Sequence, residues 1–336
     1  MVVKIIKNNL LFFSIILFLS LLPLAIQDSP RLINIISLAF IWSIVASSWD
    51  LSMGYARIFS FGHIAFFVIG CYASILTVIH LGVPPSIGIL LGGLIASGIG
   101  VTIALPCLRL SGIYVAVVTY GIHLIIPSFL TWQRELTGGA TGLFGFTPLV
   151  LGQYAFSPSN PITSYYFIFG LFTLLIYALY RIIKSPIGLA LMCLRDSQSF
   201  GESIGINVYK YKVIAFGISA FMAGLMGGIY TSFYDAVTPA LLNVDTFLMV
   251  LIMVMLGGLG KFPGSVFGAF AITFAVEMLR PAGLARFVIL GAIVIVVMII
   301  MPKGLIGVGG YIKNYIQRYI RQSKKGESND RSKNSG

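Results

Sequence analysis

Apolar residues occur along this chain in long runs that charged residues, Pro or Gly separate from one another. A transmembrane helix needs about 20 predominantly apolar residues, and stretches of about this length recur through most of the chain. The ten runs span residues 10–26, 32–49, 58–80, 86–105, 111–131, 163–183, 213–234, 244–260, 264–279 and 285–301. The pattern therefore predicts an all-α polytopic membrane protein with about ten transmembrane helices.

The positions of Lys and Arg give the predicted spans an orientation. If the N-terminus is cytoplasmic and all ten runs cross the membrane, 18 of the 22 Lys and Arg residues face the cytoplasm. The remaining four, Arg31, Arg134, Arg280 and Arg286, fall outside. Cytoplasmic loops are enriched in Lys and Arg, and one miscounted span would reverse every later loop. We therefore predict that both termini are cytoplasmic.

Composition agrees with a membrane protein and excludes other classes. Apolar residues make up 58% of the chain and charged residues 10%, against about 45–50% and 25% in ordinary soluble domains. Ten spans leave no room for a separate soluble domain. The net charge of +12 follows from basic residues that border the spans, so we expect no nucleic-acid binding.

Neither the cysteines nor the N-terminus adds a further feature. The cysteines Cys71, Cys107 and Cys193 are widely spaced, which predicts neither a metal site nor a disulfide framework. Lys4 and Lys7 precede the first run as in a signal peptide, but no clear small-residue cleavage site follows. We expect an uncleaved first span.

A polar segment, residues 184–212, interrupts the apolar pattern and is called the polar loop below. Ser185 before Pro186 offers an N-cap and a first-turn proline, which predicts a helix over residues 186–195. Asp196 and Ser197 offer a second cap, Glu202 falls in the helix that follows, and Gly205 is placed to end it. Two short helices in series are therefore predicted.

Apolar side chains on the polar loop suggest contact with something outside it. Leu189, Met192, Phe200 and Ile204 would leave a partly apolar surface, and such surfaces often mark docking sites. A loop that lies on the membrane would cover the same residues, so the sequence leaves both alternatives open.

The longest predicted outer loop, residues 132–161, carries the segment LTGGATG. Its glycines, Gly138, Gly139 and Gly142 after Thr137, permit a turn that points backbone N–H groups at a carboxylate. A flexible surface loop explains the same residues equally well.

Ionisable residues inside predicted spans are functional candidates, because burying charge in lipid is costly. Glu277 is the main one, but Arg280 follows at a spacing that permits pairing, so a structural ion pair competes with a coupling site. His63 and His123 are expected to be hydrogen-bonded packing residues. Asp50 falls at a predicted membrane edge, where a solvated or capping role is expected.

Glycine is frequent, with 37 residues, and small residues let membrane helices approach closely. A glycine followed three residues later by a basic residue, and then by a Phe- and Gly-containing stretch, occurs at residues 54–62 and again at 258–268. This similarity is consistent with an internal duplication or with chance.

The C-terminal region differs from the rest of the chain. Tyr-Ile pairs recur every four residues over 311–321, beside basic residues, which predicts an amphipathic helix for an anionic membrane surface. Residues 322–336 are almost without apolar side chains and are predicted to be disordered. We divide the chain into a transmembrane domain, 1–310, and this tail, 311–336.

Four ordered segments resemble one family of membrane proteins. They are LSMGYARIFSFGHIAFFVIGCYAS at 51–74, LRLSGIYVAVVTYG with the LTGGATGL loop, SPIGLALMCLRDSQSFGESIGINVYKYKVIAFGISAFMAGLMGGIY, and VLGGLGKFPGSVFGA with MPKGLIG. Together they resemble permease subunits of branched-chain amino acid ABC importers, specifically the LivM type, over residues 48–307. Urea and simple-sugar permeases share this architecture.

The resemblance implies a ten-helix permease bundle in a bacterial or archaeal cytoplasmic membrane. Its implied partners are two ABC ATPase subunits, a second permease of the LivH type and an extracytoplasmic substrate-binding protein. It also implies that the polar loop couples the permease to the ATPases. The glycines and the exposed position of the loop at 137–142 suggest separately that this loop helps to receive substrate or the binding protein. The implied coupling residues are Arg195, Asp196, Glu202, Ser203, Ile204, Gly205 and Ile206, and the outer residues are Thr137, Gly138, Gly139 and Gly142.

The sequence carries no nucleotide-binding signature of its own. No G-x-x-x-x-G-K-S/T motif occurs, and Gly260-Lys261-Phe262 lacks the hydroxyl that would hold magnesium. We therefore predict no enzyme activity, catalytic residue, metal or cofactor in this chain, and import of branched-chain amino acids driven by partner ATPases. The alternatives are a permease for urea or another small polar solute, and an ion-coupled secondary transporter.

Overall fold

The computed structural model describes residues 18–110, 112–145, 149–151 and 154–283, together with six positions between 285 and 295. The last predicted span, 285–301, falls mostly outside these ranges, and the first, 10–26, is described only from residue 18 onward. The predictions for the start of the chain and for the tail, 311–336, fall wholly outside them.

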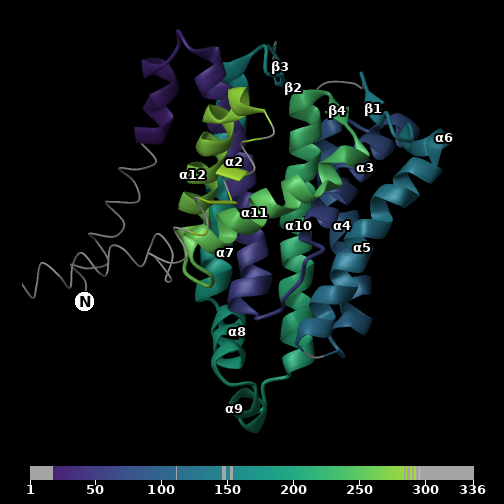
Figure 1. Cartoon of the computed structure of the whole chain (residues 1–336), viewed down its shortest axis with the longest axis vertical. Coiled ribbons are helices and arrows are strands. Elements are labelled where there is room, and N and C mark those ends of the chain that lie inside the picture. Colours follow the sequence, from purple (N-terminus) through teal and green to yellow (C-terminus); the bar gives the residue numbers. More distant parts are fainter. Residues whose placement is uncertain are drawn as a thin grey trace, which may run out of the picture.

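Six helices in the described part of the chain are long and apolar enough to cross a membrane. They are α2 (Pro30–Asp50), extended to Tyr55 by the π-helical turn η1 (Leu51–Tyr55), α3 (His63–Leu81), α4 (Pro85–Cys107), α5 (Ile113–Trp132), α7 (Pro161–Lys184) and α10 (Val208–Tyr234). Each coincides with a predicted apolar run, and together they form an elongated bundle (Figure 1). The protein is a multi-pass helical membrane protein.

Two further apolar runs form helices that are shorter than a membrane span. The helices α11 (Val244–Gly257) and α12 (Gly264–Met278) have 14 and 15 residues. The short helix η2 (Pro239–Leu242) precedes α11, and Gly258 and Gly260, with φ of +97° and +66°, end it. Figure 1 shows α11 at mid-height of the bundle, between α2 and α10.

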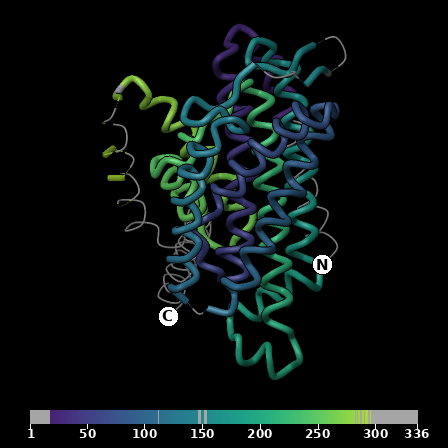
Figure 2. Tube along the Cα trace, turned by 90° about the vertical axis from the view of Figure 1, so that its right-hand side faces the viewer, coloured from purple at the N-terminus to yellow at the C-terminus, as the bar shows by residue number. Residues whose placement is uncertain are grey.

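The two ends of the bundle differ in structure (Figure 2). At one end, called the loop end, lie α8 (Pro186–Asp196) and α9 (Gln198–Ser203), and α9 projects beyond the other helices. At the opposite end, called the strand end, lie α6 (Arg134–Thr137) and two antiparallel strand pairs. These pair β1 (Leu143–Phe144) with β4 (Ala236–Val237) and β2 (Val150–Leu151) with β3 (Tyr154–Ala155); η3 (Arg280–Ala282) follows α12.

Glycines bring three helix backbones into direct contact, as the sequence predicted. A Cβ added to Gly70 of α3 would overlap the carbonyl of Gly224 in α10. One added to Gly92 of α4 would lie 2.7 Å from the carbonyl oxygen of Gly70. Because any larger side chain would force these backbones apart, the contact between α3, α4 and α10 depends on glycine.

A second group of contacts joins α2 to α7 and α12 through aromatic rings. The fully buried ring of Phe40 meets those of Tyr165, Phe169, Phe172 and Phe270, with centroid separations of 4.7 to 5.5 Å. Ring contacts at such distances stabilise a specific arrangement of helices. Helix α2 is therefore packed against both α7 and α12.

Candidate functional site: the polar loop and its junction with the helices

The polar loop folds as its sequence predicts, with two capped helices in series. The Ser185 hydroxyl accepts a hydrogen bond from the N–H of Ile187 at 3.2 Å, and Pro186 occupies the first turn of α8. The Ser197 hydroxyl accepts one from the N–H of Phe200 at 3.3 Å and caps α9. Of the two residues proposed for the second cap, Ser197 makes the contact, because Asp196 still belongs to α8.

Gly205 ends this pair of helices in the predicted manner. Its φ of +84° lies in the left-handed region that glycine adopts most easily. The N–H of Gly205 donates to the carbonyl of Glu202 at 3.0 Å, and that of Ile206 donates to Gly201 at 2.9 Å. The Ser203 hydroxyl donates to the Phe200 carbonyl at 2.8 Å. Carbonyl groups at the end of α9 therefore accept hydrogen bonds from residues of the same loop.

The polar loop presents an apolar surface to its surroundings. Phe200 and Ile204 are each 57% exposed and Leu189 is 59% exposed. Of the four apolar residues predicted to lie there, Met192 differs, because it packs partly against the core. Figure 1 shows α9 beyond the ends of the spanning helices.

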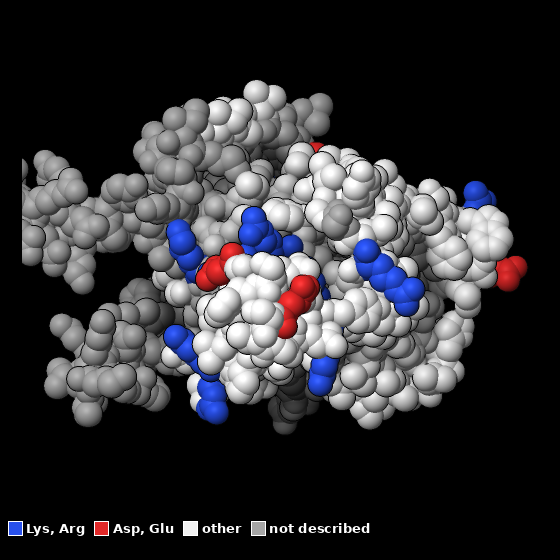
Figure 3. Space-filling view, turned by 90° about the horizontal axis from the view of Figure 1, so that it is seen from below, with Lys and Arg blue, Asp and Glu red and all other residues white. Residues whose placement is uncertain are grey.

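Charged groups surround this apolar surface (Figure 3). Glu202 accepts a hydrogen bond from Nε2 of Gln198 at 3.1 Å, and Lys212 donates to Oε1 of the same Gln198 at 3.4 Å. Arg195 and Asp196 form an ion pair at 3.1 Å. The predicted coupling residues thus lie at the end of α8, at the end of α9 and in the three residues that follow α9.

Arg195 also connects the polar loop to the end of α2. Nη1 of Arg57 donates to the carbonyl oxygen of Arg195 at 3.0 Å. The Arg195 guanidinium lies close to Gly260, since a Cβ added to that glycine would stand 2.7 Å from Nη1 of Arg195. The last turn of α8 therefore contacts two segments that directly follow helices of the bundle, one after η1 and one after α11.

Asp50 is the buried centre of this junction. Its side chain is 2% exposed, and its Oδ1 accepts a hydrogen bond from the N–H of Gly260 at 2.8 Å. Arg195 is a cation whose charge acts on it. The expectation of a solvated side chain is wrong, because Gly54 and the loop after α11 close over the carboxylate. The expectation of a capping role is closer, since Asp50 satisfies a backbone N–H of another segment.

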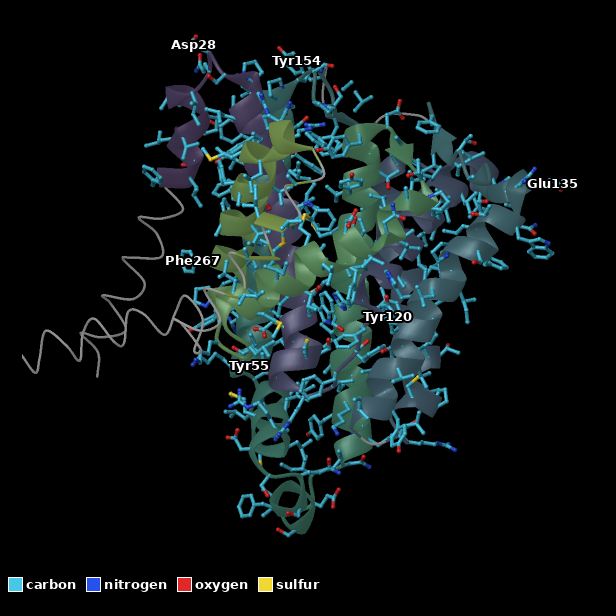
Figure 4. All side chains as sticks on the ribbon, in the orientation of Figure 1. Asp28, Tyr55, Tyr120, Glu135, Tyr154 and Phe267 are labelled. Atoms are coloured by element: carbon cyan, nitrogen blue, oxygen red, sulfur yellow. The ribbon has the colours of Figure 1, made fainter. Side chains whose placement is uncertain are left out.

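Two glycines allow these segments to meet. A Cβ on Gly54 would overlap both the Asp50 carboxylate and the backbone nitrogen of Gly260. One on Gly260 would lie 2.8 Å from the carbonyl oxygen of Gly54. A second hydrogen bond, from the N–H of Phe262 to the hydroxyl of Tyr55 at 2.9 Å, joins the same segments; Figure 4 labels Tyr55 near the top of α8.

The junction therefore unites the two stretches that share a sequence pattern, 54–62 and 258–268. Their origin by duplication stays a prediction, but their contact is a finding. Because these segments are in contact, a displacement of α8 would act directly on the end of α2 and on the loop between α11 and α12. The junction consists of hydrogen bonds and close packing between segments, which suit the transmission of movement rather than the catalysis of a reaction.

The predicted outer residues form a compact turn at the strand end. The N–H groups of Gly138, Gly139 and Gly142 donate to Arg134, to the Thr137 hydroxyl and to Gly139 respectively. All three glycines have φ between +63° and +82°. These internal bonds hold the loop in shape, and a carboxylate ligand would have to displace them to bind the same N–H groups.

The other candidate residues take part in contacts that stabilise the fold. Arg280 and Glu277 pair at 3.5 Å, as predicted. His63 shares a hydrogen bond of 2.9 Å with Ser48, as expected of a packing histidine. His123 is buried and stacks on Tyr120. Neither of its ring nitrogens has a partner at hydrogen-bond distance and angle. Tyr120 is labelled in Figure 4.

Metal ligation finds no support in the described part of the chain. It contains no group of three His, Cys, Asp or Glu residues placed to hold a metal ion, and its cysteines are free thiols.

The sequence does not predict that Asp50, Gly54 and Gly260 contact one another. The hydrogen bond between Asp50 and Gly260 joins residues 210 positions apart, which no local pattern predicts. One signal was available, because the two glycine patterns that drew attention in the sequence are the segments that meet here.

Comparison with known proteins relates the chain to one family. The family model described as "Branched-chain amino acid transport system / permease component" matches residues 31–301. The chain is 28% identical over 295 residues to the high-affinity branched-chain amino acid transport system permease protein LivM of Escherichia coli, which covers 82% of this chain and 69% of that protein.

More distant similarity extends to related permeases. The LivH permease protein of Salmonella typhimurium is 25% identical over 298 residues, or 82% of this chain and 94% of that protein. The ribose import permease protein RbsC of Haemophilus influenzae is 29% identical over 135 residues, or 38% and 42% of the two chains. No solved structure matches this chain.

Proposed function

Because the chain belongs to the family of permease components of branched-chain amino acid transport systems, we propose that it carries these amino acids through the membrane as one subunit of an ABC importer. ATP hydrolysis takes place on partner subunits, and this chain converts their movement into alternating access. The membrane in question is the cytoplasmic membrane of a bacterium or archaeon.

One observation carries the coupling part of this proposal. The polar loop projects beyond the bundle with an exposed apolar surface, while the last turn of α8 is bonded to the end of α2 through Arg57 and Arg195. A partner that binds Phe200 and Ile204 and then moves would therefore displace the end of α2 and the loop at Gly260. Packed interiors transmit such displacements because they deform little.

The complete importer requires partners besides this chain. In the proposal, two ABC ATPases bind at the loop end, a second permease of the LivH type packs beside this one, and an extracytoplasmic binding protein delivers substrate at the strand end. The transmembrane domain comprises residues 1–310 with ten spans and both termini cytoplasmic, followed by the tail at 311–336. The charge asymmetry of the sequence supports this orientation.

The coupling residues are those that the polar loop gathers, Arg195, Asp196, Glu202, Ser203, Ile204, Gly205 and Ile206. The outer turn formed by Thr137, Gly138, Gly139 and Gly142 contributes to receiving substrate or the binding protein. Its rigid, hydrogen-bonded shape suits a contact surface between folded proteins.

Reconstitution tests the proposal against an ion-coupled carrier. The permease pair, the ATPases and the binding protein are incorporated into liposomes, and radiolabelled leucine uptake is measured with competing urea and ribose. We expect uptake that needs ATP and both ATPase copies and that isoleucine and valine compete for. Uptake without ATPases, driven by an ion gradient, would refute the proposal, and competition by urea alone would change the substrate.

A further inference from the structure

A basic cavity opens at the loop end, where the polar loop forms part of its lining, and it shares Arg57 with the Asp50 junction. Its volume is about 320 Å³, and its lining residues come from four parts of the chain: 57–59; 108–110, 112 and 115; 198; and 208, 209 and 212. Three cations, Arg57, Arg109 and Lys212, line it, and no acidic side chain does. The cavity therefore concentrates positive charge where the helix ends leave an open space.

These cations retain free hydrogen-bonding capacity for an anion. Arg57 commits Nη1 to the Arg195 carbonyl, and the ammonium of Lys212 donates to Gln198 at 3.4 Å. A guanidinium has five N–H donors and an ammonium has three, so both keep donors available. Glu202, whose charge acts on Lys212, is held by Gln198 and lies outside the cavity lining.

The cavity lies at the ends of three apolar helices, and lipid headgroups lie at the ends of helices that span a membrane. It lies where α4 ends at Cys107, where α5 begins at Ile113 and where α10 begins at Val208, which are the borders of three apolar helices. The hydroxyl of Tyr209 donates to the Leu105 carbonyl at 2.7 Å and fixes two of these ends to one another. The walls are therefore formed mainly at the ends of these three helices, and α9 contributes Gln198.

An apolar surface continues from the cavity along α5. Ile113, Tyr114 and Val117 are 72%, 65% and 65% exposed, and Leu110, which lines the cavity, is also exposed. A cationic pocket that opens onto an apolar helix face offers both parts of a phospholipid a place. Basic pockets between membrane helices bind anionic headgroups in this way.

We propose that this cavity binds the phosphate-bearing headgroup of an anionic phospholipid, with its acyl chains along the exposed face of α5. Bound there, the lipid bridges the α4–α5 hairpin, the start of α10 and the coil before α3. The proposal goes beyond the transport function, since lipid binding is measured without any uptake.

The test compares lipid retention by the assembled importer and its variants. The purified complex is delipidated, exchanged into nanodiscs with equal phosphatidylglycerol and phosphatidylcholine, and analysed for retained lipid by native mass spectrometry. The variant Arg109→Ala with Lys212→Ala removes two cavity cations. The control Arg134→Ala with Lys210→Ala removes the same charge from positions outside the lining.

We expect the native protein and the control to retain phosphatidylglycerol selectively, and the cavity variant to bind it roughly 30-fold more weakly, as two lost cationic contacts at a membrane surface predict. An equal loss in the control would assign retention to diffuse charge and overturn the proposal. Unchanged lipid retention with loss of the ATPase subunits would instead assign the cavity to an acidic side chain of that partner. Failure of uptake with normal lipid retention would count against the proposed function alone.

Discussion

At the scale of single residues, the junction depends on a buried carboxylate and two glycines. Asp50 accepts its hydrogen bond from Gly260 only because neither Gly54 nor Gly260 has a side chain. The carboxylate is the hydrogen-bond acceptor of a partly buried backbone N–H, and leaving a fully buried polar group unsatisfied costs about 1–3 kcal/mol. The contact is therefore both a structural connection and a point of sensitivity.

Replacing Gly54 by Val tests this contact. The new side chain would overlap the Asp50 carboxylate and the backbone of Gly260, so we expect a destabilisation of about 1–3 kcal/mol and loss of uptake. Thermal unfolding in detergent and leucine uptake measure the two effects.

The matched control is Gly98→Val in α4, because a Cβ at Gly98 meets no atom within 4 Å. Its stability and uptake should stay close to those of the native protein. Equal behaviour of the two variants would mean that the junction is not closely packed.

The residue scale also marks the limit of prediction from the sequence. Ser185, Ser197 and Gly205 were found correctly because caps act on residues two or three positions away. Asp50 was misjudged as solvated because its cover comes from Gly260, far along the chain. Local chemistry is readable from a sequence, whereas the partner of a buried charge depends on which helices pack together.

At the scale of elements, α8 and α9 form a projecting unit with an exposed apolar surface. Such a surface is costly in water unless a partner covers it. We therefore treat Phe200 as the main anchor of ATPase docking, since large aromatic side chains dominate protein interfaces.

The substitution Phe200→Asp should release the ATPases without unfolding the permease, because the ring is 57% exposed. Co-purification of the ATPase subunits should fall at least tenfold, which is the modest end of the loss for an interface anchor. The control is Phe144→Asp, which changes a ring that is 61% exposed at the strand end. If both variants keep the ATPases, Phe200 is not part of the docking surface.

The outer turn gives a second prediction at this scale. Gly138 and Gly139 have positive φ, and a Cβ on Gly138 would overlap the Gly142 carbonyl. Changing both to Val should distort the turn and reduce binding-protein-dependent uptake, while ATPase co-purification stays normal. Unchanged uptake would remove this turn from the site.

Element prediction succeeded for the long helices and was less complete for α11 and α12. Apolar runs predict each of the six helices of spanning length in the described part of the chain. The runs at 244–260 and 264–279 were read as full spans, but they form helices of 14 and 15 residues. An apolar run indicates that a segment lies in the membrane, whereas the length of its helix also depends on where Gly258 and Gly260 turn the chain.

At the scale of the whole molecule, the protein has two distinct ends on either side of an apolar bundle (Figure 2). The loop end carries α8, α9 and the basic cavity, and the strand end carries α6 and the strand pairs. The proposed orientation puts the loop end in the cytoplasm.

Cys193 provides a natural probe of this orientation. It is partly exposed on α8, whereas Cys71 and Cys107 are buried. A membrane-impermeant thiol reagent should label Cys193 in inside-out vesicles and leave intact cells unlabelled. In a Cys193→Ser background, Tyr154→Cys at the strand end should give the opposite result, and labelling of Cys193 from outside would reverse the proposed topology.

The most direct test of the account compares ATP hydrolysis with leucine uptake in the reconstituted importer. Two polar-loop variants are measured: Glu202→Lys, which reverses a charge on α9, and Gly205→Arg, which places a large side chain where φ is +84°. Glu202→Gln, which keeps the side-chain length, serves as the control. The account predicts that both polar-loop variants assemble and hydrolyse ATP but lose at least nine-tenths of their uptake, roughly the tenfold effect of about 1.4 kcal/mol of lost coupling. Normal uptake by both variants would contradict it.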